Sequence, residues 1–313
     1  MTLTGFAKFA WGLLAYNVLV ILWGALVSST GSGAGCGNRW PDCNGVIAPD
    51  PSVKTVIEFS HRLTSGLDGL LVIGFVLWAW RAFPAGHRVR TGAVISLALV
   101  LTEGLIGALL VRQGWTAFDT SVERVIMQPL HFVNTLLLLA AVALTAWWAS
   151  GGAAVQWRGA GWQKVWFGAG VAGVFFIGSS GAIISLGDLL ADALGESHNT
   201  LVGGLVSLRL WHPAIAIGVG LYLLWLAFYV ARATPNDAAR RFARLTCGLV
   251  VAQWLAGFLN VLLRAPVWMQ LLHLLLADAT WIALVLWSAS ALAQSEALPA
   301  VSSVSVGRGA AAD

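Results

Sequence analysis

Four of the six histidines lie within long apolar segments, where an ionisable side chain is costly and usually functional. These residues are His61, His131, His212 and His273. Neutral imidazole binds metal without placing a charge in an apolar environment. Two imidazoles that face each other inside a helical bundle suit bis-histidine ligation of a heme iron. We therefore expect these histidines to bind heme, and the alternative for any one of them is a hydrogen bond to a neighbouring helix.

The histidines belong to an internal repeat. The segment Met127–His131 (MQPLH) recurs as Met269–His273 (MQLLH), and Thr102–Gly107 (TEGLIG) is echoed by Ala252–Gly257 (AQWLAG). The repeat pairs the first histidine with the third and the second with the fourth, so each half supplies two. An even number of spans in each half gives a parallel repeat with its axis along the membrane normal.

The two halves differ beside their first histidines. Glu58 lies three residues before His61, and Arg209 lies three residues before His212, a spacing that places both side chains on one helix face. Arginine can bind heme propionates, whereas a carboxylate repels them but can accept a proton or position water. We therefore expect a permanent cofactor site in the second half and a reaction site in the first. The alternative for Glu58 is an ion pair with a nearby cation, which could be Arg62, Lys54 or Arg124.

Three further acids, Asp68, Glu103 and Asp278, also lie within the expected spans. Asp68 follows His61 by seven residues and lies on a similar helix face. For all three residues the sequence is compatible both with proton relay and with structural hydrogen bonding.

The cysteines suggest an oxidising compartment for one loop. Cys36 and Cys43 lie close together after the first apolar segment, and on the oxidising side of a membrane such a pair can form a disulfide. Two free thiols are the alternative. Zinc is less favoured because neither a second pair nor a nearby histidine completes four ligands. Cys247 lies in an apolar segment and is expected to be an ordinary buried cysteine.

Long helices must position these residues. The chain is 58% hydrophobic and 10% charged, whereas soluble domains carry about 25% charged residues, so most of its surface must face lipid. A spanning helix needs roughly 20 apolar residues and satisfies its own backbone hydrogen bonds. The sequence predicts an all-α integral membrane protein whose eight transmembrane helices form two tandem four-helix bundles related by pseudo-twofold symmetry. The expected spans are 9–29, 56–83, 91–111, 125–149, 164–187, 206–231, 242–263 and 267–292.

The lysines and arginines indicate an orientation. Eleven lie at the two termini and in the loops after the second, fourth and sixth spans, against six on the opposite side. Because the side richer in these residues is usually cytoplasmic, we expect both termini in the cytoplasm of a bacterial cell. The net charge of +4 then reflects topology and requires no nucleic-acid partner. The polar tail, 295–313, is expected to be disordered.

These motifs together resemble the bacterial and mitochondrial heme A synthases, over nearly the whole chain. The Glu-x-x-His-Arg element alone would be weak, but the cysteine loop, four histidines and repeat make the combination specific. The segments that carry the resemblance are Thr30–Gly33, Cys36–Gly45, Glu58–Arg62, Gln128–His131, His212 and Leu272–His273.

The resemblance implies a reaction and a cofactor. A ring methyl group of heme O would be hydroxylated twice, and the gem-diol would lose water to give the formyl group of heme A for cytochrome oxidase. A b-type heme would lie in the second half, 151–294, held by His212 and His273 with Arg209 nearby. The chain would thus be an oxidoreductase acting on a methyl group of its substrate.

The resemblance also assigns roles in the first half, 1–150. His61 and His131 would hold the substrate heme O, and Glu58 would orient water or accept a proton. Cys36 and Cys43 would form the family's external disulfide. Some relatives carry a second cysteine pair after the fifth span, but the acidic segment 188–208, expected here to be a loop, contains none.

Two other classes of function remain open. A diheme cytochrome that only carries electrons would need no carboxylate at one site and arginine at the other. A heme transporter or chaperone would need a route between leaflets, although no histidine is expected in the inner leaflet. The expected partners are heme O, membrane lipid, a heme O synthase and oxidase assembly factors, with the oligomeric state left open.

Overall fold

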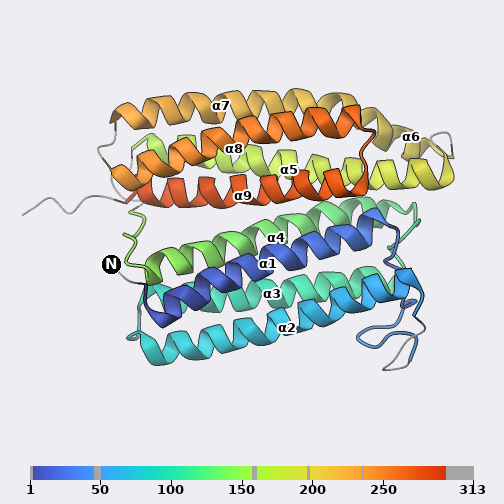
Figure 1. Ribbon diagram of the computed structural model, residues 1–313, viewed down its shortest axis with the longest axis horizontal. Helices are drawn as coiled ribbons and strands as arrows, with labels where there is room; N and C mark the ends of the chain where they lie inside the picture. The colour runs from blue at the N-terminus through green and yellow to red at the C-terminus, as the bar shows by residue number, and fades with distance from the viewer. Residues whose placement is uncertain (1–2, 46–50, 157–160, 196–197, 234–235, 294–313) are drawn as a thin grey trace, which may run out of the picture.

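All regular structure in the computed structural model is helical over the residues that it describes, which are 3–45, 51–156, 161–195, 198–233 and 236–293 (Figure 1). The first half contains α1 (Gly5–Ser29), α2 (Val53–Ala82), α3 (Arg88–Arg112) and α4 (Val122–Ala149). The second half contains α5 (Gln163–Leu194), α6 (Thr200–Ser207), the 3₁₀ turn η1 (Leu208–Leu210), α7 (Trp211–Ala233), α8 (Asp237–Leu262) and α9 (Val267–Ala291). The tail 295–313, Arg158 and Glu196 lie outside the described residues.

Local sequence determines where the helices start and stop. Ser52 and Ser121 precede α2 and α4, and each side-chain oxygen accepts a hydrogen bond from the backbone N–H three residues later, which caps the free donors of the first turn. Gly31 and Gly151 follow α1 and α4 with φ angles of 60° and 85°. Glycine adopts this left-handed conformation without strain and so ends a helix.

The prediction of eight apolar helices is confirmed. Within the described ranges, eight helical segments are long and apolar enough to cross a membrane, with α6, η1 and α7 counted together as Thr200–Val230. The chain is therefore a multi-pass membrane protein, and its all-α fold is as expected.

The prediction that 188–208 is a loop was wrong. Helix α5 continues to Leu194, and α6 occupies most of the remainder. The reason is a small apolar cluster in which Leu186 and Leu190 of α5 pack against Val202 and Leu205 of α6. Burial of these side chains stabilises helix beyond the apolar core of the span, despite the acidic residues between them.

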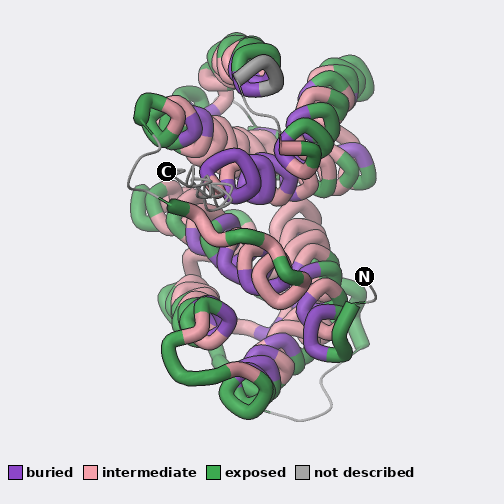
Figure 2. The backbone as a smooth tube through the Cα atoms, turned by 90° about the vertical axis from the view of Figure 1, so that its left-hand side faces the viewer, coloured by how far each residue is buried: buried purple, intermediate pink, exposed green. Residues whose placement is uncertain are grey.

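The helices form two groups of four long helices. In the first half α1 packs on α2 and α4, and α3 packs on α2 and α4. In the second half α8 packs on α7 and α9, and α5 packs on the same two helices. Helices α1 and α4 face α5 and α9 between the two groups (Figure 1). Seen from the end, the two groups lie one above the other (Figure 2). The pseudo-twofold relation between the groups stays a prediction.

The core lies where the groups meet. Trp281 of α9 is buried, donates through its indole N–H to the carbonyl of Leu136 in α4 at 2.7 Å, and contacts Phe175 of α5. By contrast, Leu105 and Phe258 are exposed on the outer surface. This distribution is the one that a lipid-facing protein requires, because its apolar exterior does not need to be covered.

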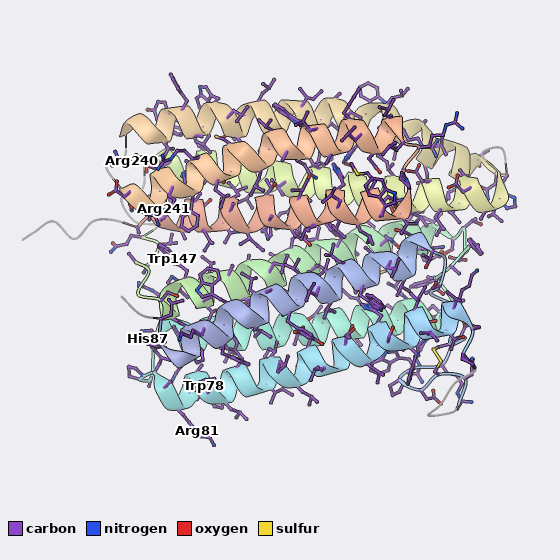
Figure 3. The ribbon with its side chains drawn as sticks, in the orientation of Figure 1. Trp78, Arg81, His87, Trp147, Arg240 and Arg241 are labelled. Carbon is purple, nitrogen blue, oxygen red and sulfur yellow. A yellow bond between two sulfur atoms is a disulfide. The ribbon has the colours of Figure 1, made fainter. Side chains whose placement is uncertain are left out.

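The two ends of the molecule differ, because arginines gather at one end and the disulfide lies at the other. Arg81, Arg240 and Arg241 lie at the end where the chain begins, and the disulfide lies at the opposite end (Figure 3). This arrangement agrees with the charge count of the sequence. The orientation relative to the cytoplasm stays a prediction.

Candidate functional site

The structure groups the four half-buried histidines into two pairs. In the first half, His61 on α2 lies close enough to His131 on α4 for a charge on one to affect the other. In the second half, His273 on α9 has the same relation to His212, which lies in the first turn of α7. Each half therefore brings two imidazoles together, as the repeat predicts.

Every one of these histidines faces a glycine of a neighbouring helix. A methyl group added to Gly24 of α1 would lie 2.9 Å from Cε1 of His61, and one added to Gly181 of α5 would lie 3.3 Å from Cε1 of His212. The corresponding distances are 4.0 Å from Gly107 to His131 and 3.2 Å from Gly257 to His273. Side chains larger than hydrogen at Gly24, Gly181 and Gly257 would crowd the imidazoles.

Three of the four imidazoles have a buried nitrogen without a hydrogen-bond partner among the described residues. These nitrogens are the Nδ1 atoms of His61, His131 and His273. The Nδ1 atom of His212 lies 2.8 Å from the hydroxyl of Ser180, and Nε2 of His273 lies 3.3 Å from the amide nitrogen of Gln253. A buried polar atom without a partner is destabilising. Two imidazoles in each half are a donor set that fits a bis-histidine heme.

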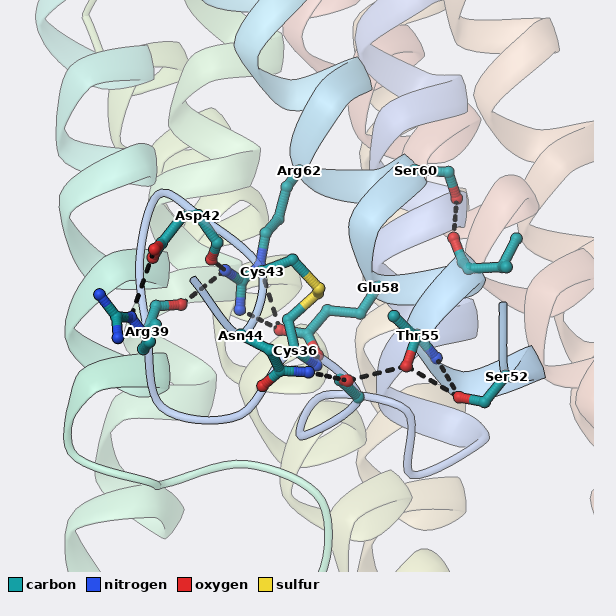
Figure 4. The surroundings of a disulfide bond; sticks show 12 residues. Cys36, Arg39, Asp42, Cys43, Asn44, Ser52, Thr55, Glu58, Ser60 and Arg62 are labelled. Carbon is teal, nitrogen blue, oxygen red and sulfur yellow. Dashed lines mark hydrogen bonds and ion pairs between the residues drawn. A yellow bond between two sulfur atoms is a disulfide. The ribbon is translucent and has the colours of Figure 1, made fainter. Parts of the chain in front are cut away.

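Glu58 lies at the disulfide end of α2, with its carboxylate almost fully buried (Figure 4). One oxygen accepts a hydrogen bond of 2.8 Å from the backbone N–H of Cys36, and the other pairs with the guanidinium of Arg62. Of the three candidate cations, Arg62 is thus the partner. Lys54 instead lies over the ring of Phe118.

The disulfide loop is tied to the same carboxylate. Cys36 and Cys43 form a disulfide, which confirms the predicted pairing, and both are fully buried. Arg62 donates from Nη1 to the carbonyls of Arg39 at 2.6 Å and Asp42 at 2.7 Å (Figure 4). Glu58 and Arg62 together therefore hold both ends of the disulfide loop against α2.

Arg209 also has an acidic partner. Its Nε donates to a carboxylate oxygen of Asp188 on α5 at 2.6 Å, and the Arg209 side chain is 39% exposed. This pair joins η1 to α5 just before His212. The expected role of Arg209 toward propionates stays a prediction.

The three intramembrane acids have different surroundings. Asp68 accepts a hydrogen bond of 2.9 Å from Asn17 of α1. Glu103 of α3 accepts hydrogen bonds from Asn134 and Thr135 of α4. Asp278 of α9 is fully buried, and neither of its carboxylate oxygens has a hydrogen-bond partner among the described residues.

Sequence reasoning misses two features of the site. Gly24 has no motif around it and is recognisable only by its contact with His61. The sequence identifies Glu103 as an intramembrane acid but does not by itself predict its proximity to His131. The signal available is the repeat, in which Glu103 and its counterpart Gln253 each precede a glycine by four residues.

No cluster of three or more histidine, cysteine or acidic ligands suitable for a bare metal ion occurs in the described part of the chain. A cavity of about 560 Å³ lies away from the histidines, between α7 and α8, and Arg240, Arg244 and Cys247 help to line it. The histidine pairs, rather than this cavity, are therefore the candidate functional site.

Comparison with known proteins adds to this geometry. Residues 7–53 and 50–285 match the COX15-CtaA family, described as cytochrome oxidase assembly protein. The protoheme IX farnesyltransferases of two strains of Thermus thermophilus are each 50% identical over 293 residues, or 91% of this chain and 48% of theirs. The heme A synthase of Shouchella clausii is 44% identical over 128 residues, or 41% of this chain and 40% of that protein. The chain thus spans about half the length, or less, of the curated relatives that it matches.

Proposed function

The chain belongs to the COX15-CtaA family of cytochrome oxidase assembly proteins, and from this premise we propose that it oxidises a ring methyl group of heme O to the formyl group of heme A. The family membership bears out the resemblance found in the sequence. The observation that best supports the reaction is the presence of two histidine pairs in one chain. One pair can hold a substrate heme while the other holds a heme that stays bound.

The proposed division of labour follows the two halves. His61 and His131 in residues 1–150 would hold heme O, and His212 and His273 in residues 151–294 would hold heme b, whose propionates Arg209 would bind. When bound, the porphyrin and its iron supply the redox chemistry that side chains lack. The chain supplies axial ligands, orientation and an apolar environment that also accepts the farnesyl tail of heme O.

Glu58 is the proposed catalytic carboxylate of the first half. It lies three residues before His61 on the same helix and is held by Arg62 and the backbone of Cys36. Both contacts fix the position of its oxygens, which is what orienting a water molecule requires. The disulfide loop therefore contributes to the site by holding this carboxylate in place.

The comparisons support a partner as well. Two relatives named protoheme IX farnesyltransferase are 50% identical to this chain over only 48% of their own length. Farnesylation of protoheme IX is the class of reaction that yields a farnesylated heme substrate. We therefore propose that a heme O synthase supplies the substrate at the same membrane, with oxidase assembly factors receiving the product.

The test is heme analysis by chromatography and mass after co-expression with a heme O synthase in a host that lacks heme A. New heme A, or its hydroxylated intermediate, is the expected result. The control is the same host with the heme O synthase alone. Purified protein that carries only heme B while heme O stays unchanged, in the presence of an electron acceptor, would instead identify an electron-carrying cytochrome.

A further inference from the structure

Glu103 faces the first histidine pair from α3. Its Oε1 atom accepts a hydrogen bond from the Thr135 hydroxyl at 2.5 Å, and Oε2 accepts one from the Asn134 amide at 2.5 Å. Oε1 also lies 3.5 Å from Nδ1 of His131. Within the described residues, no lysine or arginine lies within ion-pairing distance of this carboxylate. The two donors on α4 therefore fix a carboxylate oxygen beside the imidazole.

The second half has a matching contact of different chemistry. Gln253 of α8 lies with its amide nitrogen 3.3 Å from Nε2 of His273. Both Glu103 and Gln253 precede by four residues a glycine that faces the same histidine, Gly107 or Gly257, and residues four apart share a helix face. The two positions are thus equivalent in the repeat and each side chain lies beside its histidine, but Glu103 contacts Nδ1 of His131 and Gln253 contacts Nε2 of His273.

The residues that hold Glu103 change together with it. The offset of 142 residues that relates His131 to His273 (273 − 131) places Leu276 at the position of Asn134 and Ala277 at the position of Thr135. Neither leucine nor alanine has a side-chain donor. The first half therefore contains an acidic acceptor with two donors that fix it, and the second half contains a neutral amide with neither.

We propose that Glu103 is a positioning residue for His131, and that it gives the substrate heme of the first half an axial imidazole different from those of heme b. Glu103 accepts the Nδ1–H of His131, which leaves Nε2 as the iron ligand and fixes the ring orientation. A contact of 3.5 Å is longer than a good hydrogen bond, and such contacts shorten when a site binds its ligand. This inference rests on the proposed heme O site.

The consequence is that His131 in the first half should be a more basic iron ligand than His273 in the second half. A carboxylate that accepts from an axial imidazole makes the ligating nitrogen more basic than a neutral partner does, and loss of such a partner typically costs about 10–100-fold in metal affinity. A more basic ligand favours the ferric over the ferrous iron. The first half is thereby suited to a heme that gives up electrons during the reaction.

The experiment uses the full-length chain, purified with its heme b, and the variant Glu103→Gln, which copies the residue of the second half. Ferric heme O is titrated into each protein, and its dissociation constant and low-spin electron paramagnetic resonance signal are measured. We expect the dissociation constant to rise about tenfold or more and the signal of the added heme to shift, while that of heme b stays unchanged. The reciprocal control, Gln253→Glu, should shift the heme b signal instead.

Two further results separate this inference from the proposed function. Unchanged affinity and an unchanged signal in Glu103→Gln would overturn the positioning role, even if the variant were less stable. Should that variant fail to fold, Thr135→Val removes one donor to the carboxylate and should weaken heme O binding in the same direction. Equal heme O binding by wild type and His131→Ala would overturn the proposed substrate site itself.

Discussion

The buried carboxylate of Glu58 has a structural role and a proposed catalytic role. Glu58 is 3% exposed, so both of its oxygens need partners in the protein. The backbone N–H of Cys36 and the side chain of Arg62 provide them. Glu58 thus links the disulfide loop to α2, and it is also the proposed catalytic group. A substitution there should affect both stability and catalysis, and the two effects can be measured separately.

We predict that Glu58→Gln lowers the free energy of unfolding by about 3 kcal/mol, because breaking a buried pair leaves the Arg62 charge unpaired. Thermal and denaturant unfolding in detergent measure this loss. The variant should keep its heme b and form no heme A in the co-expression test. Asp42→Asn is the matched control: its ion pair with Arg39 is exposed, and exposed pairs contribute about 1 kcal/mol or less. Normal heme A formation by Glu58→Gln would reduce this carboxylate to a structural role.

We predict that His212→Ala and His273→Ala each lose tightly bound heme b, because the proposed site needs both imidazoles to hold the iron. Heme content per protein, measured by the pyridine hemochrome absorbance, gives the result. His61→Ala is the control within the same fold and should retain heme b. Wild-type heme b content in either second-half variant would contradict the assignment of the cofactor site.

Close packing between helices fixes the positions of the histidine rings. Four glycines lie opposite four histidines, and at Gly24, Gly181 and Gly257 an added methyl group would come within 3.4 Å of the ring. By contrast, Gly66, Gly69 and Gly218 have no atom within 4 Å of an added methyl group. Glycines within one chain therefore serve different purposes, and only their contacts distinguish them.

We predict that Gly257→Ala lowers heme b occupancy, because its Cβ would lie 3.2 Å from Cε1 of His273 and would displace the ring from its position. Gly248→Ala on the same helix is the control, since nothing lies within 4 Å of an added methyl group there. The control should keep full occupancy while gaining helix propensity worth up to about 1 kcal/mol. Equal heme content in the two variants would show that this glycine does not position the histidine.

The helices themselves could be predicted because span length and hydropathy are local properties. The continuation of α5 to Leu194 could not, because it depends on contacts between Leu190 and residues of α6 that are distant from the apolar run. The histidine pairing followed from the repeat. The partner of Glu58 could not be predicted, because the sequence left Arg62, Lys54 and Arg124 as candidate cations. Only the fold of the disulfide loop against α2 identifies Arg62.

At the scale of the whole molecule, charge distribution and fold give one consistent orientation. Arg81, Arg240 and Arg241 share the end at which the chain begins, and the Cys36–Cys43 disulfide lies at the other (Figure 3). A disulfide is stable in the oxidising compartment, and the arginine-rich end is expected to face the cytoplasm. Two independent physical effects thus favour the same topology.

We predict that green fluorescent protein fused after residue 293 fluoresces in a bacterial host, because this end of the protein is expected to lie in the cytoplasm. Alkaline phosphatase fused at the same position should be inactive, because this enzyme is active only after export from the cytoplasm. The control is the same pair of reporters fused within the segment between α3 and α4, where the activities should be reversed. An active phosphatase at the first position would place the arginine-rich end outside the cytoplasm and contradict the proposed orientation.

The contacts of α9 have a consequence for biogenesis. Helix α9 packs against α1, α4, α5 and α8, so the faces of α1 and α4 that it covers stay uncovered until it is synthesised. The interval from the end of α4 to the end of α9 is 142 residues (291 − 149), or roughly 7 to 28 s at about 5–20 residues per second. For that time the nascent first half lacks the Trp281 indole, which adds a second hydrogen bond to the carbonyl of Leu136. The order in which the helices are synthesised therefore leaves these faces of the first half exposed in the membrane until α9 is made.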